Sequence, residues 1–242
     1  MSRSDSPTVV LVHGAFADAS SFARVIPGLI ARGLDVVAPA VPNRSLLGDS
    51  AYIASIVRQI PGPVVLVGHS YGGAVITVAG VEDNVRGLVY LAGYALEEGE
   101  SLGELQGGFP DSDLAAALVY TPFPIEGSAA PGTDVSVQIE KFPSIFAADV
   151  DPRLASVLAV SQRPLAAQAF SEKAPKAAWK TKPSWGVVAT ADHTINPDVE
   201  RYGYQRAGMR TVEVDSSHLV MLARPERVIQ LIEEAVRATA AD

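Results

Sequence analysis

Residues 64–75 read VVLVGHSYGGAV and place a serine between an apolar run and a stretch of small residues. The run has the composition of a buried strand, and residues 74–79 can form a helix that packs against it. Gly68 and Gly72 lie two positions either side of Ser70. A strand, a sharp turn and a helix form a nucleophile elbow, in which the turn raises the serine hydroxyl above the sheet. The stretch therefore predicts a reactive serine at the end of a parallel strand.

Two other interpretations fit the same letters. An ordinary turn between a strand and a helix would leave the serine without a role, and Gly-x-Ser-x-Gly is too short a pattern to exclude this by itself. A dinucleotide-binding loop is disfavoured because Gly-x-Gly-x-x-Gly is absent. The choice depends on the partners that the rest of the chain provides for the serine.

Short apolar runs alternate with longer amphipathic stretches along the chain. The runs are residues 8–12, 35–38, 64–67, 87–91, 185–189 and 211–214. They are continuous rather than alternating, which is typical of strands buried on both faces of a parallel sheet. Helical spacing of apolar residues follows in residues 18–32, in residues 50–60 and after Arg224. The pattern predicts an α/β fold with a mostly parallel six-stranded sheet and helices on both faces.

One segment, residues 94–183, interrupts this alternation. It holds nine of the 17 prolines, at positions 110, 122, 124, 131, 143, 152, 164, 175 and 183. Prolines at this density divide helices into short pieces. We therefore expect residues 1–242 to form a single domain, with 94–183 as an inserted, small helical cap of short helices and loops over one edge of the sheet.

A serine hydroxyl needs a base, and His218 is the best placed of the four histidines. It follows the last expected strand, so it lies at the same edge of the sheet as Ser70, beyond the carboxyl ends of the strands. The base in turn needs an acid to orient it. Asp192 leaves the fifth strand at this edge, 26 positions before His218 (218 − 192 = 26). Asp198 is the alternative acid, and Asp215 is too close in sequence to His218.

An oxyanion formed at this serine would need backbone N–H donors. The N–H of Tyr71, directly after the serine, is expected to be one of them. The second is expected from the loop after the first strand, from Ala15 or, as the next candidate, from Phe16. His13 in that loop is expected to shape it, and His69 is expected to point away from the serine.

The motifs LVHGAF, GHSYGG and ADH…SSH resemble those of the α/β-hydrolase superfamily over nearly the whole chain. More narrowly, they resemble its compact esterase and hydroxynitrile-lyase-like branch. This resemblance implies a six-stranded sheet with a small cap inserted after the fourth strand. It implies Ser70 as nucleophile, His218 as base and Asp192 as orienting acid. It also implies Ala15 and Tyr71 as the oxyanion donors.

Two positions bear on the type of reaction. The lyases of the branch that this chain resembles carry a threonine in the loop after the first strand and a lysine directly after the histidine. This chain has Gly14 and Leu219 at those positions, which favours ester hydrolysis. The predicted function is therefore a serine hydrolase of small carboxylic esters that forms an acyl-enzyme. The alternatives are a C–C lyase or hydrolase, a cofactor-free haloperoxidase-type activity, and a non-catalytic ligand receptor.

Aromatic and apolar side chains are candidates for the substrate pocket. Phe16 and Leu219 are the two expected to contact the substrate. Further candidates are Phe22, Tyr71, Phe123, Phe142, Phe146 and Trp179. Aromatic residues are more often ordinary core, so these further candidates carry little weight.

Composition limits the remaining possibilities. The formal net charge of −8 argues against nucleic acid or an anionic membrane surface as a partner. The chain has no cysteine, which removes disulfides and thiolate metal sites. No signal peptide or membrane span is recognisable, so a cytoplasmic location is expected. We expect a small-molecule ester as substrate, no metal or other cofactor, and possible homo-oligomers.

Overall fold

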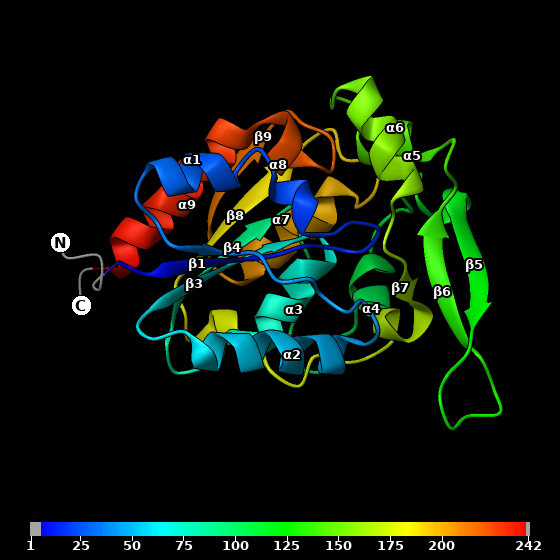
Figure 1. Cartoon of the computed structure of the whole chain (residues 1–242), viewed down its shortest axis with the longest axis horizontal. Coiled ribbons are helices and arrows are strands. Elements are labelled where there is room, and N and C mark those ends of the chain that lie inside the picture. Colours follow the sequence, from blue (N-terminus) through cyan, green and yellow to red (C-terminus); the bar gives the residue numbers. More distant parts are fainter. Residues whose placement is uncertain (1–5, 241–242) are drawn as a thin grey trace.

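A six-stranded parallel sheet forms the centre of the structure, a computed structural model that describes residues 6–240 (Figure 1). The strand order is β2-β1-β3-β4-β8-β9, and each neighbouring pair is parallel. The bounds are β1 Thr8–Val12, β2 Val36–Val37, β3 Val64–His69, β4 Val85–Leu91, β8 Ser184–Ala189 and β9 Arg210–Val214. Each strand begins and ends within two residues of the run expected for it, so the predicted fold class is confirmed.

Helices cover both faces of this sheet. Two of them, α1 Ile26–Ala31 and α9 Pro225–Thr239, lie on one face (Figure 1). The other face carries α2 Leu46–Gln59 and α3 Tyr71–Ala79. Two further helices follow the last strands of the sheet, α7 Pro197–Arg206 after β8 and the short α8 Val220–Ala223 after β9. The sheet therefore lies between two layers of helices (Figure 1).

Two of the expected helices differ from the structure at their N-terminal ends. The helix expected over residues 50–60 begins at Leu46, because the Ser45 side chain caps it by accepting from the Gly48 N–H at 2.8 Å. The helix expected over residues 18–32 is divided into a 3₁₀ turn, η1 Ala19–Phe22, and α1. Pro27 explains the break, since a proline lacks an N–H and is tolerated only in the first turn of a helix.

The segment between β4 and β8 contains a second, antiparallel sheet, which the sequence analysis did not anticipate. Its strands are β5 Leu118–Phe123, β6 Gly132–Val137 and β7 Leu165–Ala166, in that order. The segment also has the expected short helices, α4 Leu102–Gln106, α5 Phe142–Phe146 and α6 Pro152–Val160. β5 lies at an edge and is largely exposed, which is where a strand tolerates a residue such as Pro122. Its apolar pattern therefore did not resemble that of a buried strand.

This inserted segment lies at the carboxyl ends of the parallel strands. Figure 1 shows β5, β6, α5 and α6 at the end of the molecule opposite the two chain termini. Phe16, in the loop after β1, donates its backbone N–H to the Arg163 carbonyl of the segment at 2.9 Å. The segment is therefore joined to the edge at which the sequence analysis placed the reactive serine, and we refer to it as the cap.

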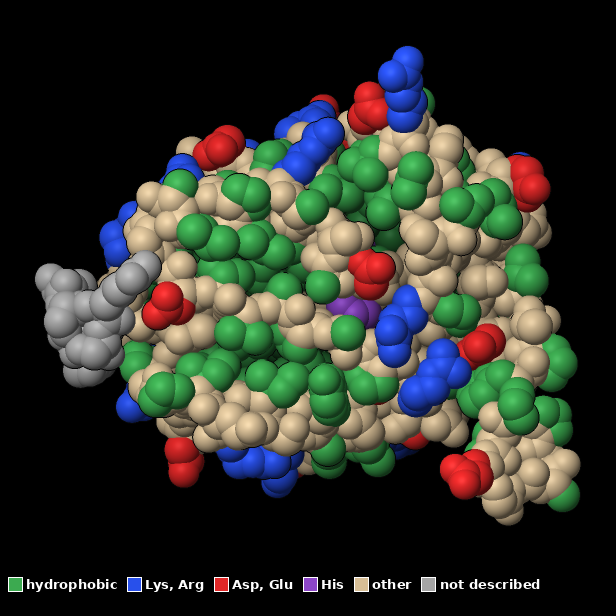
Figure 2. All heavy atoms as spheres, in the orientation of Figure 1, with side chains coloured by type: hydrophobic (Ala, Val, Ile, Leu, Met, Phe, Trp, Pro, Cys, Tyr) green, Lys and Arg blue, Asp and Glu red, His purple; other side chains and the backbone are tan. Residues whose placement is uncertain are grey.

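The surface carries charges of both signs. Figure 2 shows acidic and basic side chains scattered over one face of the molecule, with apolar side chains between them. In residues 6–240, no helix combines the length and the apolar composition that a bilayer crossing requires.

Candidate active site

Ser70 occupies a strained turn between β3 and α3. Its backbone dihedrals are φ 54° and ψ −122°, a conformation that non-glycine residues rarely adopt. The following helix passes so close to the end of β1 that a Cβ on Gly72 would lie 2.3 Å from the Val12 carbonyl oxygen. The turn is held in place because the Ser70 N–H donates to the Leu91 carbonyl at 3.1 Å. These features are those of a nucleophile elbow.

Asp192 and His218 form a buried hydrogen-bonded pair. His218 Nδ1 lies 2.5 Å from Asp192 Oδ2, and both side chains are completely buried. Asp192 Oδ1 accepts backbone N–H groups from Thr194 at 2.6 Å and from Ile195 at 3.1 Å. The imidazole proton therefore lies on Nδ1, facing the carboxylate. His218 Nε2 has no hydrogen-bond partner among the described residues and is available to accept a proton.

His69, the residue before Ser70, connects this turn to the loop that carries His218. His69 Nε2 donates to the His218 carbonyl oxygen at 3.0 Å, and the centres of the two rings are 4.6 Å apart. Within residues 6–240 the Ser70 hydroxyl makes no hydrogen bond, and the bond to a catalytic base is often long before substrate binds. The structure thus brings Ser70, after β3, to the same edge of the sheet as the Asp192–His218 pair, after β8 and β9.

The loop after β1 passes directly beside Ser70. A Cβ on Gly14 would lie 2.7 Å from the Ser70 Cβ. The Phe16 N–H is already used by the cap, whereas the described residues offer no acceptor for the Ala15 N–H. Tyr71 is the first residue of α3, so its N–H has no acceptor within the helix. Within residues 6–240 the N–H groups of Ala15 and Tyr71, the two that the sequence suggested first, have no acceptor.

His13 fixes the shape of this loop. Its Nε2 accepts the Val41 N–H at 2.9 Å, so the proton lies on Nδ1, which donates to the Gly14 carbonyl at 2.9 Å. Burial lowers the pKa of His13, which keeps the ring neutral and both bonds intact. The histidine therefore holds the loop against the chain that follows β2.

Tyr71 has a second anchor that the sequence analysis missed. Its hydroxyl donates to Asp49 Oδ2 at 2.7 Å, and both side chains are buried. Burial raises the pKa of Asp49, an effect that the bond from Tyr71 opposes. The phenol therefore points toward α2. The sequence could have indicated that Asp49 is buried, because helical spacing places it on the same face as the apolar residues Leu46 and Ile53.

Aromatic rings of the cap cover the imidazole of His218. Phe146 of α5 packs edge-on at 4.6 Å from the His218 ring centre, and Phe142 stacks on Phe146 at 4.8 Å. Phe16 contacts the same cluster, 6.0 Å from Phe146. Leu219 is buried beside it and donates its N–H to the Phe146 carbonyl at 3.3 Å. The two residues expected to contact substrate, Phe16 and Leu219, therefore lie in one apolar wall next to the imidazole.

Other candidates have partners elsewhere in the structure. Phe123 lies under the Arg44 guanidinium at the β5–β6 hairpin, and the Trp179 indole donates to the Leu96 carbonyl at 2.8 Å. Asp198, the alternative acid, is exposed and pairs with Arg201 at 2.8 Å. The structure therefore brings Asp192, and not Asp198, to the imidazole.

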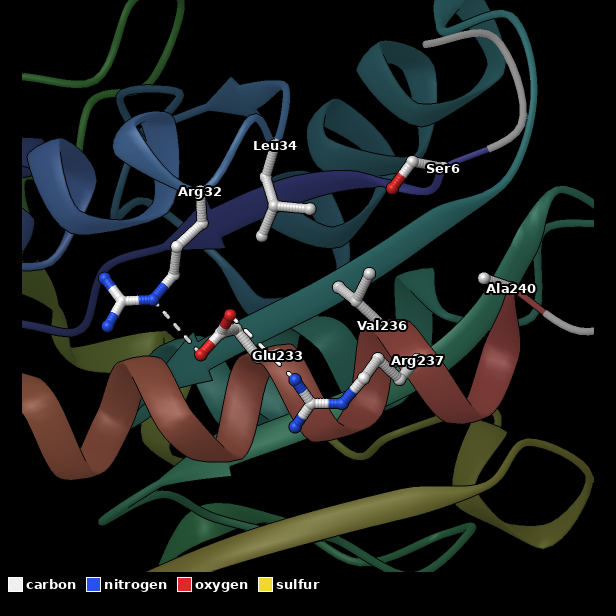
Figure 3. Close-up of a pocket in the computed structure, with 7 residues that line it drawn as sticks. All are labelled: Ser6, Arg32, Leu34, Glu233, Val236, Arg237 and Ala240. Carbon is white, nitrogen blue, oxygen red and sulfur yellow. Dashed lines mark ion pairs between the residues drawn. The ribbon is translucent and has the colours of Figure 1, made fainter. Parts of the chain in front are cut away.

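A surface pocket of about 240 Å³ lies at the other end of the sheet. Its lining residues are Ser6, Arg32, Leu34, Glu233, Val236, Arg237 and Ala240 (Figure 3). Glu233 forms ion pairs with Arg32 at 3.1 Å and with Arg237 at 3.9 Å. None of the predicted site residues lines this pocket. Among the residues that the structure describes, no group of three or more His, Asp or Glu side chains is arranged to hold a metal ion.

Curated relatives match only part of the chain. A carbendazim-hydrolysing esterase from Nocardioides sp. is 37% identical over a match that covers 38% of this chain and 44% of the relative. A pyrethroid hydrolase from Sphingobium wenxiniae is 33% identical, with 34% of each chain covered. The matches thus span less than half the length of these relatives.

Solved structures match almost the whole chain in fold. Polyneuridine aldehyde esterase superposes with a TM-score of 0.81 at 17% identity, over 95% of this chain and 99% of the other. A pyrethroid hydrolase from Sphingobium faniae superposes with a TM-score of 0.75 at 21% identity, over 98% and 99%. Residues 9–231 match the family model described as the alpha/beta hydrolase family. On this match and this fold, the chain belongs to the alpha/beta hydrolase family.

Proposed function

We propose that this chain is a serine hydrolase of small carboxylic esters. Ser70 is the nucleophile, His218 the general base and Asp192 the acid that orients it. The observation that carries the proposal is the buried Asp192–His218 bond of 2.5 Å, which leaves Nε2 unpaired at the edge of the sheet where Ser70 occupies its strained turn. A serine hydroxyl needs a base to become a nucleophile, and an acid that fixes the tautomer of that base prepares it to take the hydroxyl proton.

The first half of the reaction acylates the serine. The Ser70 oxygen attacks the ester carbonyl carbon while His218 Nε2 takes the hydroxyl proton. The developing oxyanion accepts hydrogen bonds from the N–H groups of Ala15 and Tyr71, which have no acceptor among the described residues. As the tetrahedral intermediate collapses, His218 returns the proton to the leaving alcohol. Asp192 stabilises the imidazolium that exists between these two proton transfers.

The second half of the reaction releases the acid. Water takes the place of the alcohol and is deprotonated by His218, so that it attacks the acyl carbon. The same two N–H groups receive the second oxyanion. Collapse of this intermediate breaks the bond to the Ser70 oxygen, which regains its proton from His218. Every proton is moved by one imidazole, and no redox change occurs.

Geometry at two positions supports hydrolysis over cleavage of a cyanohydrin. Gly14 has no room for a side chain, because a Cβ there would lie 2.7 Å from the Ser70 Cβ and 2.9 Å from the His69 carbonyl. Leu219 is apolar and buried, so the residue after His218 supplies no cation for a leaving cyanide. Both side chains that the resembling lyases use are therefore absent.

The relatives point to the same class of reaction. Their names describe an esterase that hydrolyses carbendazim and a hydrolase that acts on pyrethroids. The apolar wall formed by Phe16, Phe142 and Phe146 supports a substrate with an apolar group beside the scissile bond. We infer that this chain prefers short acyl esters of apolar or aromatic alcohols.

Turnover of chromogenic esters tests the proposal. The wild type is expected to hydrolyse p-nitrophenyl acetate, and Ser70→Ala is expected to lose at least about 10³-fold in kcat. Ser21→Ala is the matched control, because it removes another buried serine hydroxyl that bonds only within its own turn. Faster cleavage of mandelonitrile than of any ester in the panel would favour the lyase instead.

A further inference from the structure

A second buried carboxyl group lies next to Asp192. Glu200 is in the first turn of α7, only 1% exposed, on the helix face that also buries Val199 and Tyr204. Its Oε2 accepts the Ala189 N–H at 3.1 Å. In residues 6–240 Glu200 forms no ion pair, and the neighbouring Arg201, which opposes the rise of its pKa only weakly, pairs on the surface with Asp198 and Glu213. A fully buried carboxylate without a cation is costly, so Glu200 needs a specific explanation.

The other oxygen of Glu200, Oε1, has no donor, since within residues 6–240 no N–H or O–H group donates to it. Burial, and then the charge of the adjoining Asp192 carboxyl, raise the pKa of Glu200 well above its usual value. Two carboxyl groups in contact cannot both ionise readily, and the one with fewer donors keeps the proton. Here that group is Glu200.

Asp192 is the better hydrogen-bonded of the two carboxyl groups. It receives two backbone N–H groups on Oδ1 and the His218 Nδ1–H on Oδ2. An ionised carboxylate can accept about four hydrogen bonds. A proton on Glu200 would supply the fourth. Asp192 therefore carries the charge, and Glu200 is left with a proton to donate.

We propose that Glu200 is a positioning residue of the triad, which holds a proton on Oε1 and donates it in a hydrogen bond to the Asp192 carboxylate. Its role is to fix the orientation of Asp192 and to limit the Asp192–Glu200 pair, next to His218, to a single negative charge. A second negative charge there would hold the imidazolium too tightly for it to return its proton. This inference rests on the catalytic role proposed for Asp192 and His218.

The remaining groups around Glu200 are neutral or distant. Tyr204, one turn along α7, accepts the Gly93 N–H at 2.9 Å, and burial raises its pKa. Burial also raises the pKa of Tyr94, which follows β4. Both phenols therefore stay protonated near neutral pH. Asp192 and, behind it, His218 are the groups to which a charge on Glu200 would couple most strongly.

Two substitutions test whether Glu200 donates a hydrogen bond or only fills space. Glu200→Gln has the same shape and donates an amide N–H in place of the acid proton. It is expected to retain kcat within about threefold and to keep the acid limb of the pH–rate profile where the wild type has it. Glu200→Leu fills the space without a donor. It is expected to lose about 10- to 100-fold in kcat, with a smaller change in KM and the acid limb moved to higher pH.

Other outcomes of this comparison contradict the proposal. If Glu200 were ionised in the wild type, Glu200→Gln would remove a negative charge and move the acid limb to lower pH. If Glu200 only filled space, the Leu variant would show the wild-type profile. Should Glu200→Leu not fold, the Gln variant alone still decides between a protonated and an ionised Glu200.

A stability measurement tests the proton on Glu200 without any activity. A carboxyl group whose pKa is raised by folding binds its proton in the folded chain but loses it in the unfolded chain, so it destabilises the fold increasingly as pH rises above about 4.3. Urea midpoints of the wild type and Glu200→Gln are therefore expected to diverge in favour of Gln between pH 4.5 and 7.5. A difference that does not change with pH would overturn the proton on Glu200. An active Ser70→Ala would overturn the proposed function, and with it the role of Glu200 in the triad, but would leave the proton on Glu200 unaffected.

Discussion

At the scale of single residues, the site depends on a backbone that holds Ser70 in an unfavourable conformation. A non-glycine residue with positive φ costs about 1–3 kcal/mol and persists only where its surroundings enforce it. Three backbone hydrogen bonds do so, because Ser70 donates to Leu91 at 3.1 Å and accepts from Gly73 at 2.9 Å and from Tyr94 at 3.2 Å. The strained turn is thus compensated by ordinary bonds of the sheet and helix that flank it.

Gly14→Ala tests how closely the loop after β1 must approach Ser70. The added Cβ would meet the Ser70 Cβ at 2.7 Å and two backbone or ring atoms of His69 within 3.2 Å, so the loop has to move. Displacing the Ala15 N–H is expected to reduce kcat by about 10²- to 10³-fold, as for the loss of one oxyanion donor. Steady-state kinetics on a p-nitrophenyl ester give the size of the loss.

The matched control is Gly108→Ala in the cap, where the nearest heavy atom to an added Cβ is 3.4 Å away. This control is expected to keep the wild-type kcat. If Gly14→Ala also kept it, the assignment of the oxyanion donor to this loop would be wrong.

At the scale of helices and strands, the sequence predicted the sheet well and the cap poorly. The sheet strands are continuous apolar runs, so their signal is local and strong. β5 and β6 bury little, and residues such as Pro122 and Thr133 gave no strand pattern. Glu200 and Asp49 escaped notice for a different reason. Each is an acidic residue on a buried helix face, and only the partner on another element shows what it does.

Tyr71→Phe tests the link between α3 and α2. The variant removes the hydroxyl that bonds Asp49 and leaves a buried carboxyl group without this donor. The free energy of unfolding is expected to fall by about 1–3 kcal/mol, the cost of an unsatisfied buried polar group. Urea denaturation monitored by circular dichroism measures the change. Tyr52→Phe on α2, whose side chain is partly exposed, is the control and is expected to stay within about 0.5 kcal/mol of the wild type.

At the scale of the whole molecule, the pH dependence of stability is set by buried titratable groups around the candidate site. His13 and His69 are both completely buried and bonded as neutral rings. Burial lowers the pKa of each, and for His69 the neighbouring His218 lowers it further. Asp49 and Glu200 act in the opposite sense, because burial raises their pKa values. The pH dependence of folding is therefore a balance between these two groups of residues.

His69→Gln is expected to make the fold less sensitive to acid. A histidine whose pKa is lowered by folding costs nothing above about pH 6.5, but below that value the unfolded chain gains a proton that the folded chain refuses. Stability is thus lost as pH falls, at up to about 1.4 kcal/mol per pH unit for one proton. Glutamine can still donate to the His218 carbonyl but does not titrate. The free energy of unfolding of His69→Gln is therefore expected to fall less steeply than that of the wild type as the pH is lowered from 6.5 to 5.

The matched control for this measurement is His193→Gln, which removes an exposed imidazole. Urea denaturation at several pH values is needed for all three proteins. An identical slope in the wild type and His69→Gln would show that the buried ring does not set the acid sensitivity.

The most direct test of the central claim is the site and rate of labelling by a fluorophosphonate, which reacts with an activated serine. We expect a single adduct, located on Ser70 by peptide mass spectrometry, and no adduct in Ser70→Ala. We also expect His218→Ala to slow labelling of Ser70 by at least about 10³-fold, because the hydroxyl then lacks its base. An adduct on another residue, or labelling of Ser70 at an unchanged rate in His218→Ala, would contradict the central claim.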